Sequence, residues 1–220
     1  LPNLQWVNMQ KNVHVLEQVE SIYKINKEKT LKNNFSRFVD NNFYNKLINK
    51  NYIVVQLSSG DEIHNHKNWE FGKWDKILSL LAKKYPKIHY VLIGGPNERS
   101  LLKHININNQ IIDMIGKTSI EEMISLIKNA KLYFGLNSGP MHLAFYFKIP
   151  TLSIFGDSCS IAYGYENIAK NENLVITSNI LSKNKFFCPI CDSCTQYSLR
   201  DLKVEKVYQS AIPFFEKFLD

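Results

Sequence analysis

The stretch LYFGLNSGPMHLAFYFKIPTLSIFG, residues 132–156, decides the fold prediction. It starts with a short apolar run, passes through the polar residues 137–140 and a short helix candidate, and ends in a second apolar run. Short apolar runs that alternate with helices are typical of strands buried on both faces of a parallel sheet. The stretch therefore predicts a strand, a helix and a second, parallel strand.

The same alternation extends over the rest of the chain from residue 52 onward. We expect helices at 74–85, from about Glu98, at 119–130, after Gly139 and at 201–219, and strands at 52–58, 89–95, 110–116, 131–137, 150–156 and 174–178. This order predicts an α/β fold, a doubly wound Rossmann-like parallel sheet covered by helices on both faces. Residues 14–25 and 35–48 are further helix candidates.

The charge balance favours anionic partners. Lys and Arg outnumber Asp and Glu by 27 to 20, which gives a formal net charge of +7. Such a surface attracts phosphates, nucleotide sugars or acidic glycolipid, although solubility alone would also explain it. We expect no nucleic-acid partner, because neither a zinc finger nor an aromatic ribonucleoprotein strand accompanies the charge. The longest apolar runs fall short of the roughly 20 residues of a membrane helix, and no secretory signal pattern is present.

Residues 137–142 form a polar corner at the end of the 131–137 strand. In open parallel sheets ligands bind beyond the carboxyl ends of the strands. Gly139 lets the backbone turn and lets a ligand approach closely, and Pro140 suits the first helical position. Free N–H groups at the start of the helix favour a phosphate. Ser138 either caps this helix or donates to a phosphate, and His142 either donates to the same anion or packs on the sheet edge.

The segment NSGPMHLA at 137–144 resembles a motif of the ADP-heptose:lipopolysaccharide heptosyltransferases, glycosyltransferase family nine. Further segments resemble the family in the same order: LSS at 57–59 with KNW at 67–69, IGGPNE at 93–98, GKTSIEE at 116–122 and KIPTLSIFG at 148–156. The resemblance spans about residues 51–160. It implies a GT-B fold, in which two Rossmann-like domains face each other across a cleft.

The resemblance also implies a domain division. Residues 51–220 are similar to the C-terminal, donor-binding domain, and residues 1–50 to the interdomain connection and its helices. The family's N-terminal Rossmann-like domain, which binds the acceptor and carries an acidic base, is expected in addition to this chain. The chain begins with Leu1 rather than Met, and we expect it to bind donor but to lack the catalytic base.

The site residues follow from the matched motifs. Ser58 and Ser59 would bind the diphosphate, and Lys67 would be the catalytic cation that neutralises the leaving nucleoside diphosphate. Glu98 would accept hydrogen bonds from the ribose. The phosphate-facing helix start would comprise Ser138, Gly139, Pro140, Met141 and His142.

Alternatives stay open for several of these roles. Lys67 could be a solvated loop lysine, Glu98 could cap the helix that follows it, and Trp69 is expected to pack rather than to stack on a base. Asn137 stands where the family often has Asp, so an amide replaces a carboxylate at that substrate-binding position. The loop before Lys67, with GDEIHNH at 60–66, is longer than usual for the family.

The expected function is therefore the donor-binding part of an inverting glycosyltransferase. The family implies transfer of heptose from ADP-heptose to an acidic lipopolysaccharide core, in the cytoplasm at the inner membrane face and without a cofactor. The alternatives are a non-catalytic nucleotide-binding or scaffold module of GT-B type, and a related transferase that glycosylates protein.

The cysteines are clustered in the last third of the chain. Cys188, Cys191 and Cys194 in loop 186–195 have C-x2-C-x2-C spacing, and such thiolates can bind a structural Zn or Fe with a fourth ligand. Cys159 is the first candidate for that ligand, with Asp192 or a histidine as alternatives. A reduced or disulfide-paired loop is the other interpretation.

Overall fold

The computed structural model describes residues 51–59, 68–156, 158–165, 172–178, 180–181 and 197–219. The helices expected at 14–25 and 35–48, Lys67 and the loop 186–195 lie outside these residues, so the corresponding predictions are untested. Within the described residues, no helix combines the length and the apolar character needed to cross a membrane.

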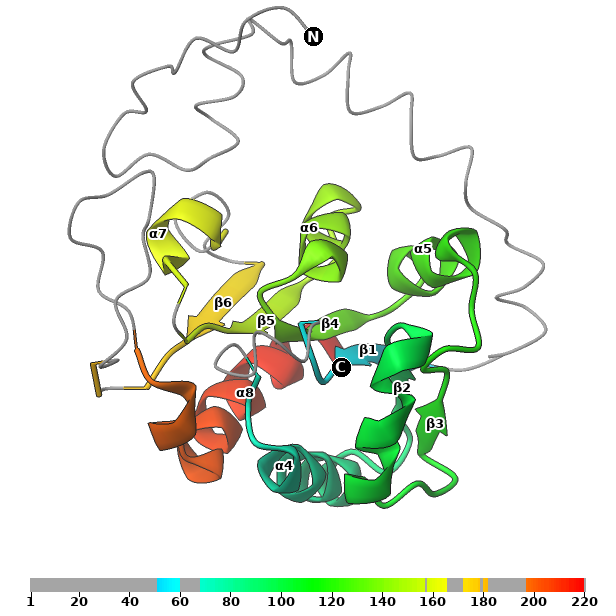
Figure 1. Cartoon of the computed structure of the whole chain (residues 1–220), viewed down its shortest axis with the longest axis horizontal. Helices are drawn as coiled ribbons and strands as arrows, with labels where there is room; N and C mark the ends of the chain where they lie inside the picture. The colour runs from blue at the N-terminus through cyan, green and yellow to red at the C-terminus, as the bar shows by residue number, and fades with distance from the viewer. Residues whose placement is uncertain are drawn as a thin grey trace, which may run out of the picture.

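In the described part of the chain, parallel strands form a six-stranded sheet in the order β3-β2-β1-β4-β5-β6 (Figure 1). Its members are β1 (Tyr52–Gln56), β2 (His89–Ile93), β3 (Ile111–Asp113), β4 (Leu132–Leu136), β5 (Thr151–Ile154) and β6 (Asn173–Ile176). The chain winds outward from β1 to β3 and then returns to the opposite side of β1 as β4. This reversal is the mark of a doubly wound sheet, so the expected fold class is confirmed.

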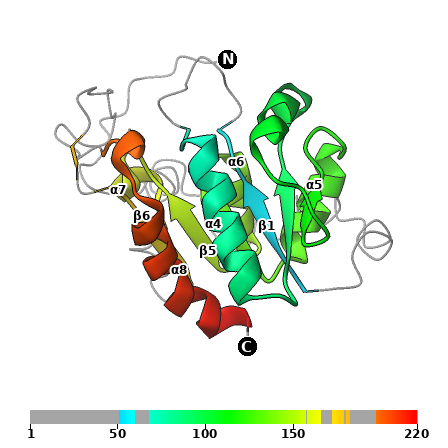
Figure 2. The same ribbon diagram turned by 90° about the horizontal axis from the view of Figure 1, so that it is seen from below.

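Helices cover both faces of the sheet (Figures 1 and 2). One face is covered by α4 (Phe71–Lys84) and α8 (Val204–Leu219), and the other by α5 (Ile120–Lys128), α6 (Gly139–Tyr146) and the short α7 (Ser160–Tyr163). Two 3-10 helices, η3 (Pro96–His104) and η4 (Leu199–Asp201), complete the described elements. We call the two sides the α4/α8 face and the α5/α6 face.

Strand β1 shows why the sequence forms this sandwich. All of its residues are buried, and successive side chains point to opposite faces of a strand. Ile53 and Val55 belong to the core on the α4/α8 face, whereas Tyr52 and Val54 belong to the core on the α5/α6 face. A strand buried on both sides is mostly apolar, which explains the near-continuous apolar runs in the sequence.

Most expected elements are present, with three differences. The helix expected from about Glu98 is the 3-10 helix η3. The last helix begins at Val204 rather than residue 201, because η4 precedes it, although Leu202 is still buried in the same core. The short helix α7 was not expected, since its four residues are too few to show a helical period.

Candidate functional site

The polar corner at 137–142 lies where the winding of the sheet reverses. Strands β1 and β4 are hydrogen-bonded neighbours, with Gln56 opposite Gly135 at their carboxyl ends. The hydroxyl of Ser138 donates to the side-chain oxygen of Gln56, so one bond joins the two strand ends. In doubly wound sheets this reversal point is where ligands bind. The fold therefore places the corner at the expected position.

A buried network of hydrogen bonds connects Ser138 of the corner to Gln56 and Tyr133 in the sheet. The hydroxyl of Tyr133 lies 2.7 Å from Oε1 of Gln56, which thus accepts from both Tyr133 and Ser138. Burial raises the pKa of Tyr133, so its phenol keeps the hydrogen that it donates. Gly135 makes room for this hydroxyl, because a Cβ there would lie 2.6 Å from the Tyr133 oxygen. Sequence analysis missed Gln56 and Tyr133, which look like ordinary strand residues.

Ser138 does not cap α6 as one alternative expected. It occupies the N-cap position, but its side chain makes no capping hydrogen bond. The single hydroxyl hydrogen goes to Gln56, so the hydroxyl cannot donate it to a ligand while that bond lasts. A phosphate contact by this hydroxyl would need the hydrogen to leave Gln56.

The backbone at the start of α6 is a better candidate for an anion than the Ser138 hydroxyl. Pro140 has no N–H, and the N–H of Met141 bonds to the carbonyl of Ser138 at 3.1 Å. Among the described residues the Gly139 amide has no backbone acceptor, so it can donate to an anion at the positive end of the helix. A Cβ at Gly139 would meet nothing within 4 Å, and its φ is not in the left-handed region. The expected tight turn therefore does not require glycine at position 139. The space beside the Gly139 Cα is open.

His142 is bonded to a residue that the sequence did not suggest. Its Nδ1 lies 2.5 Å from the hydroxyl of Tyr165, and the two rings meet edge-on with centroids 5.5 Å apart. Tyr165 is buried and follows α7. A second hydrogen bond runs from the side-chain amide of Asn137 to the hydroxyl of Ser158 at 3.2 Å. Both bonds tie the corner to the segment after β5.

The segment after β1 holds the two serines expected to bind a diphosphate. Ser58 is buried, and Ser59 donates through its N–H and its hydroxyl to Oδ1 of Asn68, at 2.9 Å and 3.2 Å. Trp69 packs as expected: it is fully buried, and its indole nitrogen donates to the carbonyl of Leu202 at 3.0 Å. Lys67 lies outside the described residues, so its role stays a prediction.

Glu98 caps η3, as the alternative interpretation expected. Its Oε2 accepts from the N–H of Gly95 at 2.5 Å, and the residue is 8% exposed. A carboxylate accepts more than one hydrogen bond, so this cap is compatible with a ribose contact. The ribose contact itself stays a prediction.

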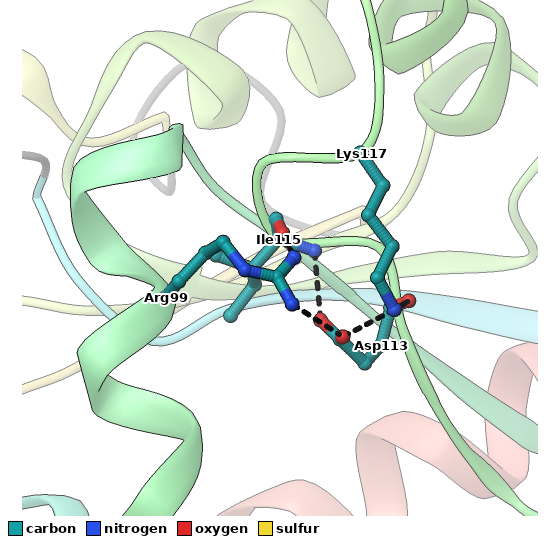
Figure 3. A network of polar contacts seen from close by, with 4 residues as sticks. All are labelled: Arg99, Asp113, Ile115 and Lys117. Carbon is teal, nitrogen blue, oxygen red and sulfur yellow. Dashed lines mark hydrogen bonds and ion pairs between the residues drawn. The ribbon is translucent and has the colours of Figure 1, made fainter.

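A charged network ties η3 to the loop after β3 (Figure 3). Arg99 donates to the carbonyl of Ile115 at 2.7 Å, and Lys117 pairs with the carboxylate of Asp113 at 2.5 Å. The N–H of Ile115 donates to the same carboxylate at 3.0 Å. Sequence analysis singled out neither Asp113 nor Arg99, and the partner of Arg99 lies 16 positions away in the loop after β3.

Gly116 brings these two loops into direct backbone contact. It has a φ of +65°, which favours glycine, and its N–H bonds to the carbonyl of Gly94 at 2.9 Å. A Cβ at Gly116 would lie 2.8 Å from Cα of Pro96. The loops after β2 and β3 therefore form one rigid rim beside Glu98.

Of the four cysteines predicted to bind a metal, the described residues include Cys159 alone. This residue is buried, and its sulfur accepts from the N–H of Ala162 at 3.3 Å as the N-cap of α7. Within the described part of the chain, no group of three or more His, Cys, Asp or Glu residues could hold a metal. The other three cysteines lie outside that part, so the metal site stays a prediction.

The family model and the curated relatives agree on one family. The model of "Glycosyltransferase family 9 (heptosyltransferase)" matches residues 4–188. The chain is 32% identical over 134 residues to lipopolysaccharide heptosyltransferase 1 of Campylobacter coli, covering 58% of this chain and 37% of the relative. It is 26% identical over 179 residues to lipooligosaccharide heptosyltransferase 2 of Campylobacter jejuni subsp. jejuni serotype O:2, covering 77% and 53%.

A solved structure supports the fold. The E. coli ADP-heptose lipopolysaccharide heptosyltransferase II superimposes with a TM-score of 0.60 at 17% identity, over 78% of this chain and 48% of that one. At this identity the likeness concerns the fold alone. The chain matches about half the length of these relatives or less, from 37% to 53%.

Proposed function

The chain belongs to glycosyltransferase family 9, and from this premise we propose that it is the donor-binding part of a heptose-transferring enzyme. The donor is ADP-heptose and the acceptor is a lipopolysaccharide core. One observation carries the proposal: the Ser138–Gln56 bond joins β4 to β1 at the winding reversal, directly before the open backbone at Gly139. That is where a doubly wound sheet offers an anion site.

The diphosphate of the donor lies against the start of α6 in this proposal. The Gly139 amide and the positive end of the helix face its oxygens, and the absence of a Cβ lets them approach. Ser58 and Ser59 contribute from the end of β1, and Lys67 supplies a full positive charge. Glu98 accepts from the ribose beside the rim formed with Gly116.

Transfer then proceeds as an inverting displacement. The acceptor hydroxyl attacks the anomeric carbon while the bond from that carbon to the diphosphate oxygen breaks, and an acidic base in the additional N-terminal domain takes the hydroxyl proton. Negative charge grows on the departing ADP, which fixed positive groups stabilise more strongly than they stabilise the bound donor. Lys67 and the helix start supply that charge, so the proposal requires no metal or other cofactor for transfer.

The basic composition supports the acceptor and the place of action. A formal charge of +7 attracts the protein to the anionic surface on which an acidic lipopolysaccharide precursor is built. We propose that the enzyme acts in the cytoplasm, at the inner membrane face. A related transferase that modifies protein would not need this surface.

Calorimetric titration of the 220-residue chain with ADP-heptose, ADP, UDP and GDP tests donor binding. We expect selective binding of the two adenine nucleotides. Gly139→Ala should weaken ADP binding by about tenfold or more, because the new Cβ enters the space assigned to the phosphate, equivalent to about 1.4 kcal/mol. Its effect on folding should be at most about 1 kcal/mol.

Gly72→Ala is the matched control. Gly72 is exposed near the start of α4, on the other face of the sheet, and a Cβ there also meets nothing within 4 Å. It should leave ADP affinity unchanged. Absence of ADP binding would contradict the donor proposal, and equal affinity in Gly139→Ala would contradict the phosphate position.

A nucleotide-binding module without transferase activity would give the same titration. The protein together with its N-terminal domain should move labelled heptose from ADP-heptose to heptose-deficient lipopolysaccharide. Failure to transfer, with donor binding retained, would favour the non-catalytic module.

A further inference from the structure

Tyr165 is held rigidly against two residues of α6. Its ring stacks on Phe145, with centroids 3.6 Å apart and an interplanar angle of 4°, and it meets His142 edge-on at 84°. His142 and Phe145 are three residues apart and therefore lie on one face of the helix. Tyr165 is 2% exposed, and its hydroxyl lies 2.5 Å from Nδ1 of His142.

We propose that the Tyr165 hydroxyl donates to Nδ1 of His142 and thereby keeps the hydrogen of the neutral imidazole on Nε2, the nitrogen that donates to the diphosphate when the donor is bound. The proposal rests on the proposed function for the identity of the ligand. Tyr165 is a positioning residue in this arrangement, since it acts on the anion only through His142.

Acid–base chemistry decides the direction of the bond. A phenol O–H is a stronger hydrogen-bond donor than a neutral imidazole N–H, and an imidazole nitrogen is a stronger acceptor than a phenol oxygen. A neutral imidazole carries one hydrogen, so a hydrogen bond accepted at Nδ1 assigns that hydrogen to Nε2. Burial raises the pKa of Tyr165, which keeps its hydroxyl protonated in the physiological range.

The tautomer has a consequence for the reaction. A neutral His142 presents a hydrogen rather than a lone pair at Nε2, so it stabilises an anion there and does not accept a proton from a sugar hydroxyl. The general base must then come from elsewhere, which agrees with its placement in the additional N-terminal domain. His142 belongs with the groups that stabilise the leaving diphosphate.

Nitrogen NMR of the full chain tests the tautomer without any ligand. Histidines are labelled with ¹⁵N, spectra are recorded at about pH 8, above the ordinary imidazole pKa of about 6.5, and His142 is assigned by the loss of its signals in His142→Gln. We expect a protonated Nε2 and an unprotonated Nδ1. Tyr165→Phe, which retains the ring that stacks on Phe145, should give a mixture of the two tautomers.

Tyr52→Phe is the control for the general loss of a buried hydroxyl. Tyr52 donates to the carbonyl of Leu126 at 2.7 Å on the same face of the sheet. It lies at the start of β1, away from the carboxyl edge. This variant should leave the His142 signals unchanged. A hydrogen on Nδ1 in the parent protein, or identical tautomers in the parent and Tyr165→Phe, would overturn the proposal.

ADP titration tests whether Tyr165 affects ligand binding through His142. Tyr165→Phe should weaken ADP binding by about 3- to 10-fold, the range of one hydrogen bond. In a His142→Gln background, whose amide donates near the Nε2 position without help from Tyr165, the same change should cost less than about twofold. An equal loss in both backgrounds would overturn the role through His142. If the parent chain binds no ADP, the proposed function fails, and the NMR result still decides the tautomer.

Discussion

The two faces of the sheet are built from the same residue types but use them differently. On the α4/α8 face, aromatic rings pack on one another with centroids 5.0 to 6.2 Å apart, among them Trp69, Trp74, Phe134 and Phe215. On the α5/α6 face, the described residues include three buried tyrosines whose hydroxyls make hydrogen bonds, Tyr52, Tyr133 and Tyr165. Both faces contain a buried core, and on the α5/α6 face two of the three hydroxyls also position groups of the candidate site.

Tyr90 and Tyr133 illustrate the difference between the two faces. It is a fully buried tyrosine on the α4/α8 face, yet its hydroxyl has no hydrogen-bond partner among the described residues. Tyr133, in the same sheet, donates to Gln56 at 2.7 Å. A buried hydroxyl that lacks a partner costs free energy, while one that has a partner contributes modestly to stability. Comparable changes at the two positions should therefore have different effects.

Trp74→Ala should have the largest effect on stability. Trp74 is fully buried, its ring centroid lies 5.1 Å from that of Trp69 and 5.0 Å from that of Phe134, and its loss leaves a large cavity. We expect the free energy of unfolding in urea to fall by about 3–5 kcal/mol. Where the variant stays folded, its ADP affinity should match that of the parent. A loss below about 1 kcal/mol, or a selective loss of ADP binding, would contradict the division between the faces.

Tyr133→Phe should have an intermediate effect on stability together with an effect on binding. It removes one of two hydrogen bonds to Gln56, which should lower the free energy of unfolding by about 1–2 kcal/mol. ADP affinity should also fall, because Gln56 holds Ser138 beside Gly139. Tyr52→Phe should lose similar stability and keep its ADP affinity. Equal ADP affinity in both variants would show that the network does not position the corner.

Tyr90→Phe should have the smallest effect on stability at neutral pH. Removing an unbonded buried hydroxyl should leave the free energy of unfolding unchanged or raise it by up to about 1 kcal/mol. Urea denaturation measures this difference. Destabilisation of more than about 1 kcal/mol would mean that the hydroxyl has a partner.

A pH series extends the Tyr90 comparison. Burial raises the pKa of Tyr90 in the folded protein, whereas the unfolded chain releases this proton near pH 10. The folded state therefore binds more protons above that pH, and its stability falls as the pH rises further. Tyr90→Phe should lose less stability than the parent between about pH 10 and 11, with no difference between them from pH 7 to 9.

The elements of the fold were largely predictable, and so was the place of the candidate site. Polar residues at 137–142 between two apolar runs, with glycine and proline at the turn, indicated a ligand-facing strand end. The partners of these residues were not predictable. Ser138 meets Gln56 from 82 positions away, and His142 meets Tyr165 from 23 positions away, in segments with no local feature that sets them apart.

By itself, the sequence determined the doubly wound α/β class, the corner at 137–142 and the family, because apolar periodicity, turn residues and ordered motifs are local properties of the chain. Tertiary structure alone decided that Gln56 takes the hydroxyl hydrogen of Ser138, that Arg99 ties the rim together and that Tyr165 faces His142. The physical reason is that a hydrogen bond depends on which groups the folded backbone brings within about 3 Å. Strand order and helix packing set that distance, and neither can be predicted from a single stretch of residues.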